Sequence, residues 1–194
     1  GLFMARVYEG PIPPIVGFLR PLEKWIHRVA RLDPATEMDW RKYATAVLSL
    51  SFLGIVATYA VQRLQGGLPL NPEGLPGVSP DSSFNTAVSF GTNTNWQGYG
   101  GETTMSYLTQ MLTLTVQNFV SAAAGMAVLV ALIRGFARQS VATIGNFWVD
   151  LVRGVVYILL PLSLVLAVVL VSQGVVQTFS PYREVSLIEP IVGE

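Results

Sequence analysis

Three segments of this chain of 194 residues are long and apolar enough to cross a lipid bilayer: residues 43–62, 111–133 and 154–174. A bilayer core takes about 20 residues to cross, and it offers no water to unpaired backbone groups, so such segments fold as helices. Only 12% of the residues are charged, whereas soluble domains carry about 25%. The sequence therefore predicts an all-α membrane protein.

The three segments differ in polarity. Residues 154–174 are the most hydrophobic and are expected to face lipid. The first half of segment 111–133 carries polar side chains, which should face protein or a water-filled cavity; they are Thr113, Thr115, Gln117, Asn118 and Ser121. Small residues from Ser121 to Gly125 allow a close approach between helices. Two interpretations of the polar half stay open: a packing interface between helices, or the lining of a wet pathway.

Lysine and arginine are concentrated in two of the connecting regions. Six lie between residues 20 and 42 and three lie between the second and third spans, whereas the region 63–110 contains one. The positive-inside rule places the first two regions in the cytoplasm and the region 63–110 on the opposite side of the membrane.

Residues 18–32 are predicted to form an amphipathic helix that lies on the cytoplasmic membrane surface. Its apolar face consists of Leu22, Trp25, Ile26 and Val29. His27, the only histidine, falls on the polar side with no acid–base partner nearby, so we expect it to be solvated or close to lipid headgroups. Thr36, with Asp39 three residues later, is predicted to cap the first spanning helix.

A short helix is predicted within the region 63–110, over residues 80–90. Ser79 supplies a side-chain cap, Pro80 suits the first turn, and Gly91 ends the helix. About ten residues cannot cross a bilayer, but they fit a re-entrant pore helix. The backbone that follows it would then lie at membrane depth, where it is tolerated only if it is buried in protein or lines water.

The loop after this helix, Gly91–Asn95, offers only neutral oxygen atoms. Threonine, asparagine and backbone oxygens can replace the hydration shell of a monovalent cation, as in potassium filters. The short helix would point the negative end of its dipole at the ion, and Gly91 permits unusual backbone angles. From Gly91 onward no carboxylate occurs until Glu102, so a calcium cage is disfavoured. The alternative is an ordinary surface loop rich in turn-forming residues.

The tripeptide Gly-Tyr-Gly at residues 98–100 resembles the potassium-channel signature, but it is preceded by Trp96 and Gln97 instead of Thr-Val. It also lies several residues past the predicted helix end. We therefore place the filter at 91–95 and interpret Gly98, Gly100 and Gly101 as turn residues.

The chain lacks the residues that several other functions require. It contains no cysteine, which excludes disulfides, thiolate metal sites and cysteine nucleophiles. It contains no GxxxxGK[ST], DKTGT, HExxH or GxSxG motif, so nothing in it indicates ATP hydrolysis or another enzymatic activity. The net charge of +0 gives no indication of a nucleic-acid partner.

Three long stretches resemble the potassium-binding A subunit of the Kdp system, the bacterial high-affinity potassium-transporting ATPase. They are "LPLNPEGLPGVSPDSSFNTAVSFGTNTNWQGYGGETTMSY", "LTVQNFVSAAAGMAVLVALIRGFARQSVATIGNFWVDLVRG" and "MDWRKYA". The resemblance extends over essentially the whole chain and implies helix–pore loop–helix repeats like those of potassium channels. The family's subunit is considerably longer, so the resemblance also implies that this chain corresponds to its beginning.

The resemblance implies the following organisation. Residues 1–5 would be the stub of a first span, and 6–42 a cytoplasmic linker with the interfacial helix. Residues 43–133 would form the first repeat, with pore helix 80–90 and filter 91–95. A cytoplasmic loop 134–153, the first helix of the second repeat at 154–174, and an extracytoplasmic tail 175–194 would follow.

The resemblance also assigns residues to the filter. Thr92, Asn93, Thr94 and Asn95 would form its first part, with Asn93 as the position most expected to contact potassium, and Gln97 would brace it. Gly91 is a departure, because many family members carry valine there, and glycine should loosen the filter entry.

By resemblance, the function is to bind K⁺ outside the bacterial plasma (inner) membrane and deliver it to the ATPase, as a multi-pass subunit that is no enzyme by itself. The implied partners are the Kdp B (ATPase) subunit, the C subunit, the F peptide and membrane lipid, and no nucleic acid. Potassium would be the transported substrate. Two alternatives remain open: a Trk/Ktr-like channel subunit without an ATPase, and a structural membrane subunit.

Overall fold

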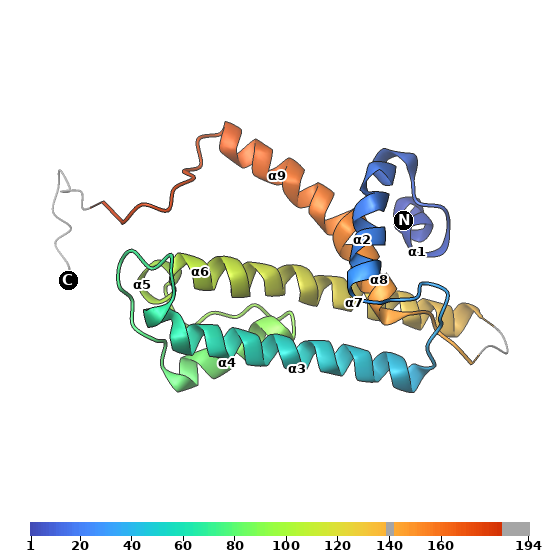
Figure 1. Cartoon of the computed structure of the whole chain (residues 1–194), viewed down its shortest axis with the longest axis horizontal. Helices are drawn as coiled ribbons and strands as arrows, with labels where there is room; N and C mark the ends of the chain where they lie inside the picture. The colour runs from blue at the N-terminus through green and yellow to red at the C-terminus, as the bar shows by residue number, and fades with distance from the viewer. Residues whose placement is uncertain (139–141, 184–194) are drawn as a thin grey trace.

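The computed structural model describes residues 1–138 and 142–183 (Figure 1). Its α-helices are α1 (Leu2–Glu9), α2 (Arg20–Val29), α3 (Trp40–Leu64), α4 (Pro80–Gly91), α5 (Gly101–Thr104), α6 (Tyr107–Thr109), α7 (Val116–Ala137), α8 (Phe147–Arg153) and α9 (Leu160–Ser172). Shorter turns are the 3-10 helices η1 (Pro14–Leu19) and η2 (Gln65–Gly67) and the π-helical turns η3 (Gln110–Thr115) and η4 (Gly154–Leu159). Within these ranges, β structure is limited to one bridge between Asp39 and Thr143.

Three helical stretches in the described chain are long and apolar enough to cross a membrane: Trp40–Gly67, Tyr107–Ala137 and Phe147–Ser172. The turn η3 joins α6 to α7, and η4 joins α8 to α9, without interrupting the helix. The prediction of an all-α membrane protein is confirmed.

The helices are longer than the apolar segments from which they were predicted. The third helix begins at Phe147, so the predicted loop 134–153 is helical at both ends. Similarly, the boundary predicted at residue 5 falls inside α1, which continues to Glu9. Polar residues flank each apolar core and extend the helix, which hydropathy does not detect. Of the predicted tail 175–194, residues 184–194 lie outside the described residues.

The helices α3 and α7 run side by side in opposite directions, and α4 packs against both of them (Figure 1). Small residues of α7 permit this close packing: Ala124, Ala127 and Ala131 form a buried cluster with Tyr43 and Ala46 of α3. Both basic connecting regions lie at the same end of the pair, where Met38 donates its N–H to the carbonyl of Gly145 at 2.7 Å. The region 63–110 lies mainly at the other end.

The caps of α3 and α4 can be compared directly with the predictions. Asp39, and not Thr36, caps α3: its Oδ1 accepts the N–H groups of Arg41 and Lys42 at 2.9 and 3.0 Å. The Lys42 N–H is the main reason that the pKa of Asp39 lies below its usual value. Thr36 instead donates its hydroxyl to Asp33 at 2.8 Å. The cap predicted for α4 is confirmed, since Ser79 accepts from the N–H of Ser82.

One buried glutamine holds the long region 63–110 together. Gln65 has no exposed surface. Its Nε2 donates to the carbonyls of Pro76 and Thr104 at 2.7 and 2.8 Å. Its Oε1 accepts from the N–H of Ser106 at 3.1 Å and from the hydroxyl of Thr109 at 3.0 Å. Every hydrogen-bonding position of this amide is used, so it links α3 to the segment before α4 and to the start of α6.

A buried ion pair joins α7 and α8 at the opposite end. Arg134 Nη1 lies 2.6 Å from Asp150 Oδ2, and Nη2 lies 2.9 Å from Oδ1. The side chains are only 7% and 3% exposed. The hydroxyl of Tyr43 in α3 lies 3.1 Å from the same carboxylate. Gly145 makes room for this pair, because a Cβ there would lie 2.1 Å from Arg134 Nη1.

The amphipathic helix is present as α2, but its orientation reverses the expectation for His27. That side chain is buried, with 8% exposure, and its Nε2 has no hydrogen-bond partner among the described residues. Glu23, on the same side of α2, accepts from Tyr157 at 2.6 Å and from Arg153 at 3.0 Å. The side of α2 that carries Glu23, Ile26 and His27 therefore meets the protein, whereas Leu22, Trp25 and Val29 point outward.

We predict that Asp150→Asn destabilises the purified protein by about 3–5 kcal/mol, because it leaves the guanidinium of Arg134 buried without its counter-charge. The measurement is the free energy of unfolding in detergent. The matched control is Glu37→Gln, which alters the exposed pair with Arg138 and should cost less than about 1 kcal/mol. Equal losses for the two variants would contradict the structural role of the buried pair.

Candidate functional site

The loop that follows α4 lies against the middle of the two long helices. The Cβ position of Gly91 points at Ile55 of α3, and Asn93 Oδ1 lies 3.2 Å from the hydroxyl of Ser121 in α7. Ile55 and Ser121 are both near the midpoints of the stretches Trp40–Gly67 and Tyr107–Ala137. At about 1.5 Å per residue, the 12 residues of α4 span about 18 Å of a bilayer core about 30 Å thick. The helix therefore ends, and irregular backbone begins, level with the middle of these two helical stretches.

The N–H groups of this loop turn back onto the C-terminus of α4. Ser89 receives three of them: its carbonyl accepts from Thr94 at 2.9 Å and Asn95 at 3.2 Å, and its hydroxyl accepts from Trp96 at 2.6 Å. The N–H groups of residues 92 and 93 bond to carbonyls of α4 in the same way. All five donors from 92 to 96 are thus paired with a single helix end.

The carbonyl groups must then point the opposite way. In a planar trans peptide, the N–H and the preceding C=O point in opposite directions, so the carbonyls of residues 91–95 face away from the end of α4. Among the described residues, the carbonyls of 92–95 accept no hydrogen bond. Asn93 and Asn95 adopt positive φ angles of 59° and 56°, which asparagine tolerates better than most residues. The result is a row of free, neutral oxygen atoms.

The hydroxyl groups of two threonines add further neutral oxygen atoms to the carbonyls of the loop. Thr92 Oγ1 donates to the carbonyl of Val88 at 2.9 Å and lies 3.0 Å from Thr94 Oγ1. Residues 92–95 are exposed in this chain, so the oxygens are open on one side. Among the described residues, no cluster of three or more His, Cys, Asp or Glu side chains could hold a metal. The arrangement suits a weakly held monovalent cation, which the negative end of the α4 dipole would also attract.

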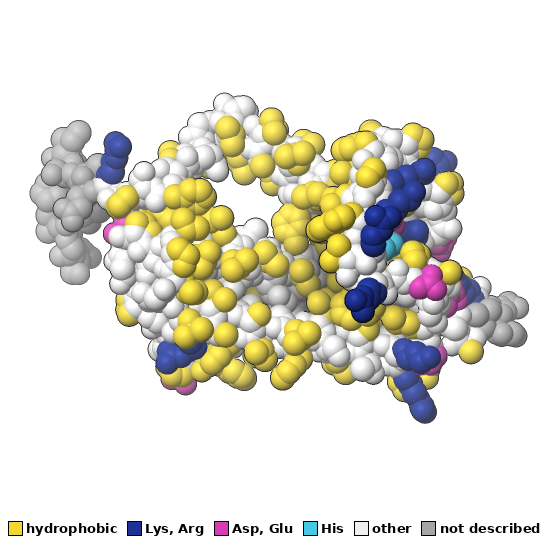
Figure 2. Space-filling model, viewed as in Figure 1, with side chains coloured by type: hydrophobic (Ala, Val, Ile, Leu, Met, Phe, Trp, Pro, Cys, Tyr) yellow, Lys and Arg dark blue, Asp and Glu magenta, His cyan; other side chains and the backbone are white. Residues whose placement is uncertain are grey.

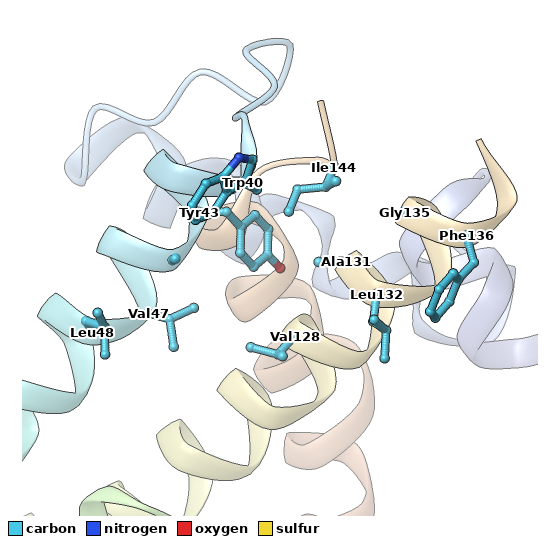
Figure 3. Close-up of a pocket in the computed structure, with 11 residues that line it drawn as sticks. Trp40, Tyr43, Val47, Leu48, Val128, Ala131, Leu132, Gly135, Phe136 and Ile144 are labelled. Atoms are coloured by element: carbon cyan, nitrogen blue, oxygen red, sulfur yellow. The ribbon is translucent and has the colours of Figure 1, made fainter. Parts of the chain in front are cut away.

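Cavities extend from the loop along the groove between α3 and α7. A cavity of about 330 Å³ touches Thr92 and Asn93 and includes Ser121 of α7. A larger apolar cavity of about 640 Å³ lies nearer the basic end, between Trp40 and Phe136 (Figure 3). Val47 and Val128 line both cavities. The side-chain oxygens of Thr92 and Asn93 border only the smaller cavity, and the larger one is lined almost entirely by apolar side chains.

Gly91 and Gln97 flank the loop and contact neighbouring elements. Gly91 belongs to the last turn of α4, and positive φ angles occur at Asn93 and Asn95 instead. Its missing side chain allows α4 to approach α3, because a Cβ would lie 2.5 Å from Ile55 Cγ1. Gln97 donates to the hydroxyl of Tyr99 at 3.2 Å.

Tyr99 belongs to the Gly-Tyr-Gly tripeptide, which follows the loop 91–95 and returns to the side of α4. Its ring packs against a buried cluster that contains Val78 and Phe90, and burial raises the pKa of its hydroxyl. Gly98, Gly100 and Gly101 all have ordinary φ angles. The tripeptide therefore serves packing of the exit segment, and a glycine-specific turn is not required there.

The polar half of the second span divides into two faces. Thr113, Gln117 and Ser121 are buried, while Thr115 and Asn118 are exposed in this chain. Gln117 packs over Gly54 of α3, and a Cβ placed on Gly54 would lie 2.7 Å from Gln117 Oε1.

Sequence reasoning missed Ser89 as a residue that holds the loop after α4. Its signal was a serine within the last turn of a helix, where the hydroxyl can bond to nearby backbone groups.

A family model described as the potassium-transporting ATPase A subunit matches residues 1–192. Proteins named potassium-transporting ATPase potassium-binding subunit are among the similar ones. That of Bordetella pertussis is 67% identical over 189 residues, which are 97% of this chain and 32% of that protein. That of Herpetosiphon aurantiacus is 64% identical over 192 residues, 99% of this chain and 33% of that protein. That of Methylococcus capsulatus is 64% identical over 189 residues, which are 97% of this chain and 32% of that protein. The chain thus spans about a third of the length of these relatives.

Ser89→Ala should loosen the loop while leaving α4 in place, because it removes only the hydroxyl that accepts the N–H of Trp96. An ordinary hydrogen bond contributes about 1 kcal/mol, so we expect exchange of the Trp96 amide to accelerate about fivefold. Hydrogen–deuterium exchange read by mass spectrometry measures this. The control is Ser82→Ala, on an earlier turn of the same helix. Unchanged exchange at residues 94–96 would show that Ser89 does not hold the loop.

Proposed function

The chain belongs to the family of potassium-transporting ATPase A subunits, and on that premise we propose that its Gly91–Asn95 loop forms part of a potassium selectivity filter. The observation that carries the proposal is the pairing of every N–H from 92 to 96 with the end of α4, which leaves the neighbouring carbonyls free at mid-depth. Free carbonyls inside a membrane protein need a partner, and a dehydrated cation provides one.

The proposed chemistry is replacement of water by protein oxygens. Neutral carbonyl and hydroxyl groups compensate the ion for its lost hydration, yet they hold it weakly enough for release. The loop supplies ligands on one side only. The remaining ligands would come from corresponding loops in the rest of the longer subunit. Thr92, Asn93, Thr94 and Asn95 are the residues we assign to K⁺, and Gly91 allows α4 to sit close enough to α3.

The mid-depth position argues against an ordinary surface loop. Asn93 is close to Ser121, and Gly91 packs on Ile55, so the loop meets the centres of two helices that could cross a membrane. The same position disfavours a purely structural subunit, because packing alone does not require a row of unpaired carbonyls. The family match favours the Kdp system over a Trk/Ktr-like channel without an ATPase.

We assign the orientation from charge. The two basic regions meet at one end, where Arg138 pairs with Glu37 at 3.0 Å, and this end would face the cytoplasm of a bacterium. The far end, where the hydroxyl of Tyr182 donates to the carbonyl of Glu102 at 3.0 Å, would be extracytoplasmic. Potassium would therefore enter the filter from outside the plasma (inner) membrane.

Energy for uptake would come from another polypeptide, since no motif for ATP hydrolysis occurs in this chain. The proposed partners are the B (ATPase) subunit, the C subunit and the F peptide of a Kdp complex. The proposed division of the chain keeps a first repeat at 43–133 and the first helix of a second repeat at 154–174.

Substitutions at Asn93 in the full-length subunit test the filter. Asn93→Ala should raise the potassium concentration for half-maximal uptake about tenfold or more while the complex still assembles, because it removes the amide and strains a positive φ angle. Asn93→Gly is the matched control: it also lacks the side chain but accepts the backbone angle. A milder defect in Asn93→Gly would show that backbone carbonyls are the main ligands.

A charged variant tests selectivity separately. Asn93→Asp should shift preference toward smaller, harder cations, because a fixed negative charge attracts them more strongly. Competition between K⁺ and Na⁺ in flux assays measures this shift. Unaltered affinity and selectivity in all three assembled variants would refute the assignment of the loop as a filter.

A further inference from the structure

The turn η1 and the helix α2 expose a continuous apolar stripe. Its side chains recur every three or four residues: two belong to the 3-10 turn η1, and three share one side of α2. They are Ile15, Phe18, Leu22, Trp25 and Val29, with exposures of 78%, 74%, 36%, 59% and 63%. Five large apolar side chains in a row would be an aggregation hazard in water. The stripe therefore calls for an apolar environment.

A basic stripe lies beside the apolar one. Arg20, Lys24, Arg28 and Arg31 are all exposed and also recur every three or four residues. At about 100° per residue, Arg20, Lys24 and Arg28 occupy a separate side of α2 from the apolar stripe, and Arg31 follows the end of the helix. Figure 2 shows Lys and Arg side chains in a row over this part of the molecule, next to hydrophobic ones. The outward surface of α2 is thus half apolar and half cationic.

The third side of α2 attaches it to the rest of the protein. Glu23 bonds to Arg153 and Tyr157, and Leu19 and Ile26 pack against the buried cluster around Val156. In a protein surrounded by water, an amphipathic helix would bury its large apolar side chains and expose its charges. Here the buried side of the helix is narrow, and the five side chains of the apolar stripe remain free.

The position of α2 matches the boundary of a membrane. In Figure 1, α2 runs across the direction of α3 and α7, so it would lie along the membrane plane if those helices cross it. Its partners Arg153 and Tyr157 stand at the start of the most apolar part of the third spanning stretch. The helix is therefore held at the level where the hydrocarbon core begins.

We propose that η1 and α2 form a docking surface for an anionic phospholipid leaflet. The apolar stripe enters the boundary between headgroups and acyl chains, and the four basic side chains meet lipid phosphates. Charge complementarity selects this occupant: a protein helix would cover the apolar stripe without needing the adjacent cations. The proposal does not depend on ion binding at residues 91–95, so either can fail alone.

The proposal is tested with the variant Trp25→Cys, which carries a fluorophore on the new cysteine; quenching of this fluorophore by nitroxide lipids is measured. This chain has no other cysteine, and cysteines elsewhere in the full-length complex would be replaced. The labelled complex is placed in nanodiscs of phosphatidylcholine and phosphatidylglycerol, with a shallow nitroxide quencher carried on one lipid or the other. We expect quenching by both, and stronger quenching by phosphatidylglycerol, up to about fivefold for each cation near the surface at low salt.

The control variants carry equal charge changes. Lys24→Gln with Arg28→Gln should reduce the preference for phosphatidylglycerol and keep the quenching by phosphatidylcholine. Arg41→Gln with Lys42→Gln, two exposed residues outside the stripe, should leave the preference unaltered. Absence of quenching by either lipid would mean that protein covers the stripe, and equal quenching by both would mean that headgroup charge is not recognised. Either result overturns the proposal.

Discussion

The pairing of backbone groups where α4 ends at mid-depth is the constraint on which the rest of the structure depends. A helix that stops inside an apolar layer leaves N–H and C=O groups that water cannot satisfy. Here the N–H groups of residues 92–96 return to α4, and Ser89 accepts three of them. This arrangement leaves the carbonyls of the loop on the opposite side, where they are free to meet an ion.

Such a loop requires rigid surroundings, and the two long helices supply them through different interactions at each end. At one end, Gln65 uses its whole amide to link the region 63–110 to α3. At the other end, Arg134 and Asp150 join α7 to α8 through two charge-assisted hydrogen bonds. Between them, small residues of α7 and the absence of a side chain at Gly91 let the three helices approach closely. Because the helices lie this close together, the loop can contact Ile55 of α3 and Ser121 of α7.

Charge performs two tasks in this chain. Buried charges such as Arg134, Asp150 and Glu23 hold helices together, whereas exposed ones on α2 and the connecting regions remain available to solvent or lipid. The positive-inside rule counts Lys and Arg residues in connecting regions without distinguishing buried ones from exposed ones. Arg134 and Arg153 thus contribute to the topology prediction and are also structural partners. The neutral loop 91–95 stands apart from both groups, since Glu102 is the first carboxylate after it.

The sequence by itself determined the all-α membrane class, the three spans, the Ser79 cap and the short helix in the region 63–110, because hydropathy and capping are local properties. The neutral oxygens that follow this helix, together with the family resemblance, singled out Gly91–Asn95 as the candidate site. Only the tertiary structure decided that Asp39 replaces Thr36 as a cap, that His27 is buried and that Ser89 organises the loop. Each of these depends on which groups meet across distant segments or around a turn, and the direction in which a carbonyl points is set by the three-dimensional path of its backbone.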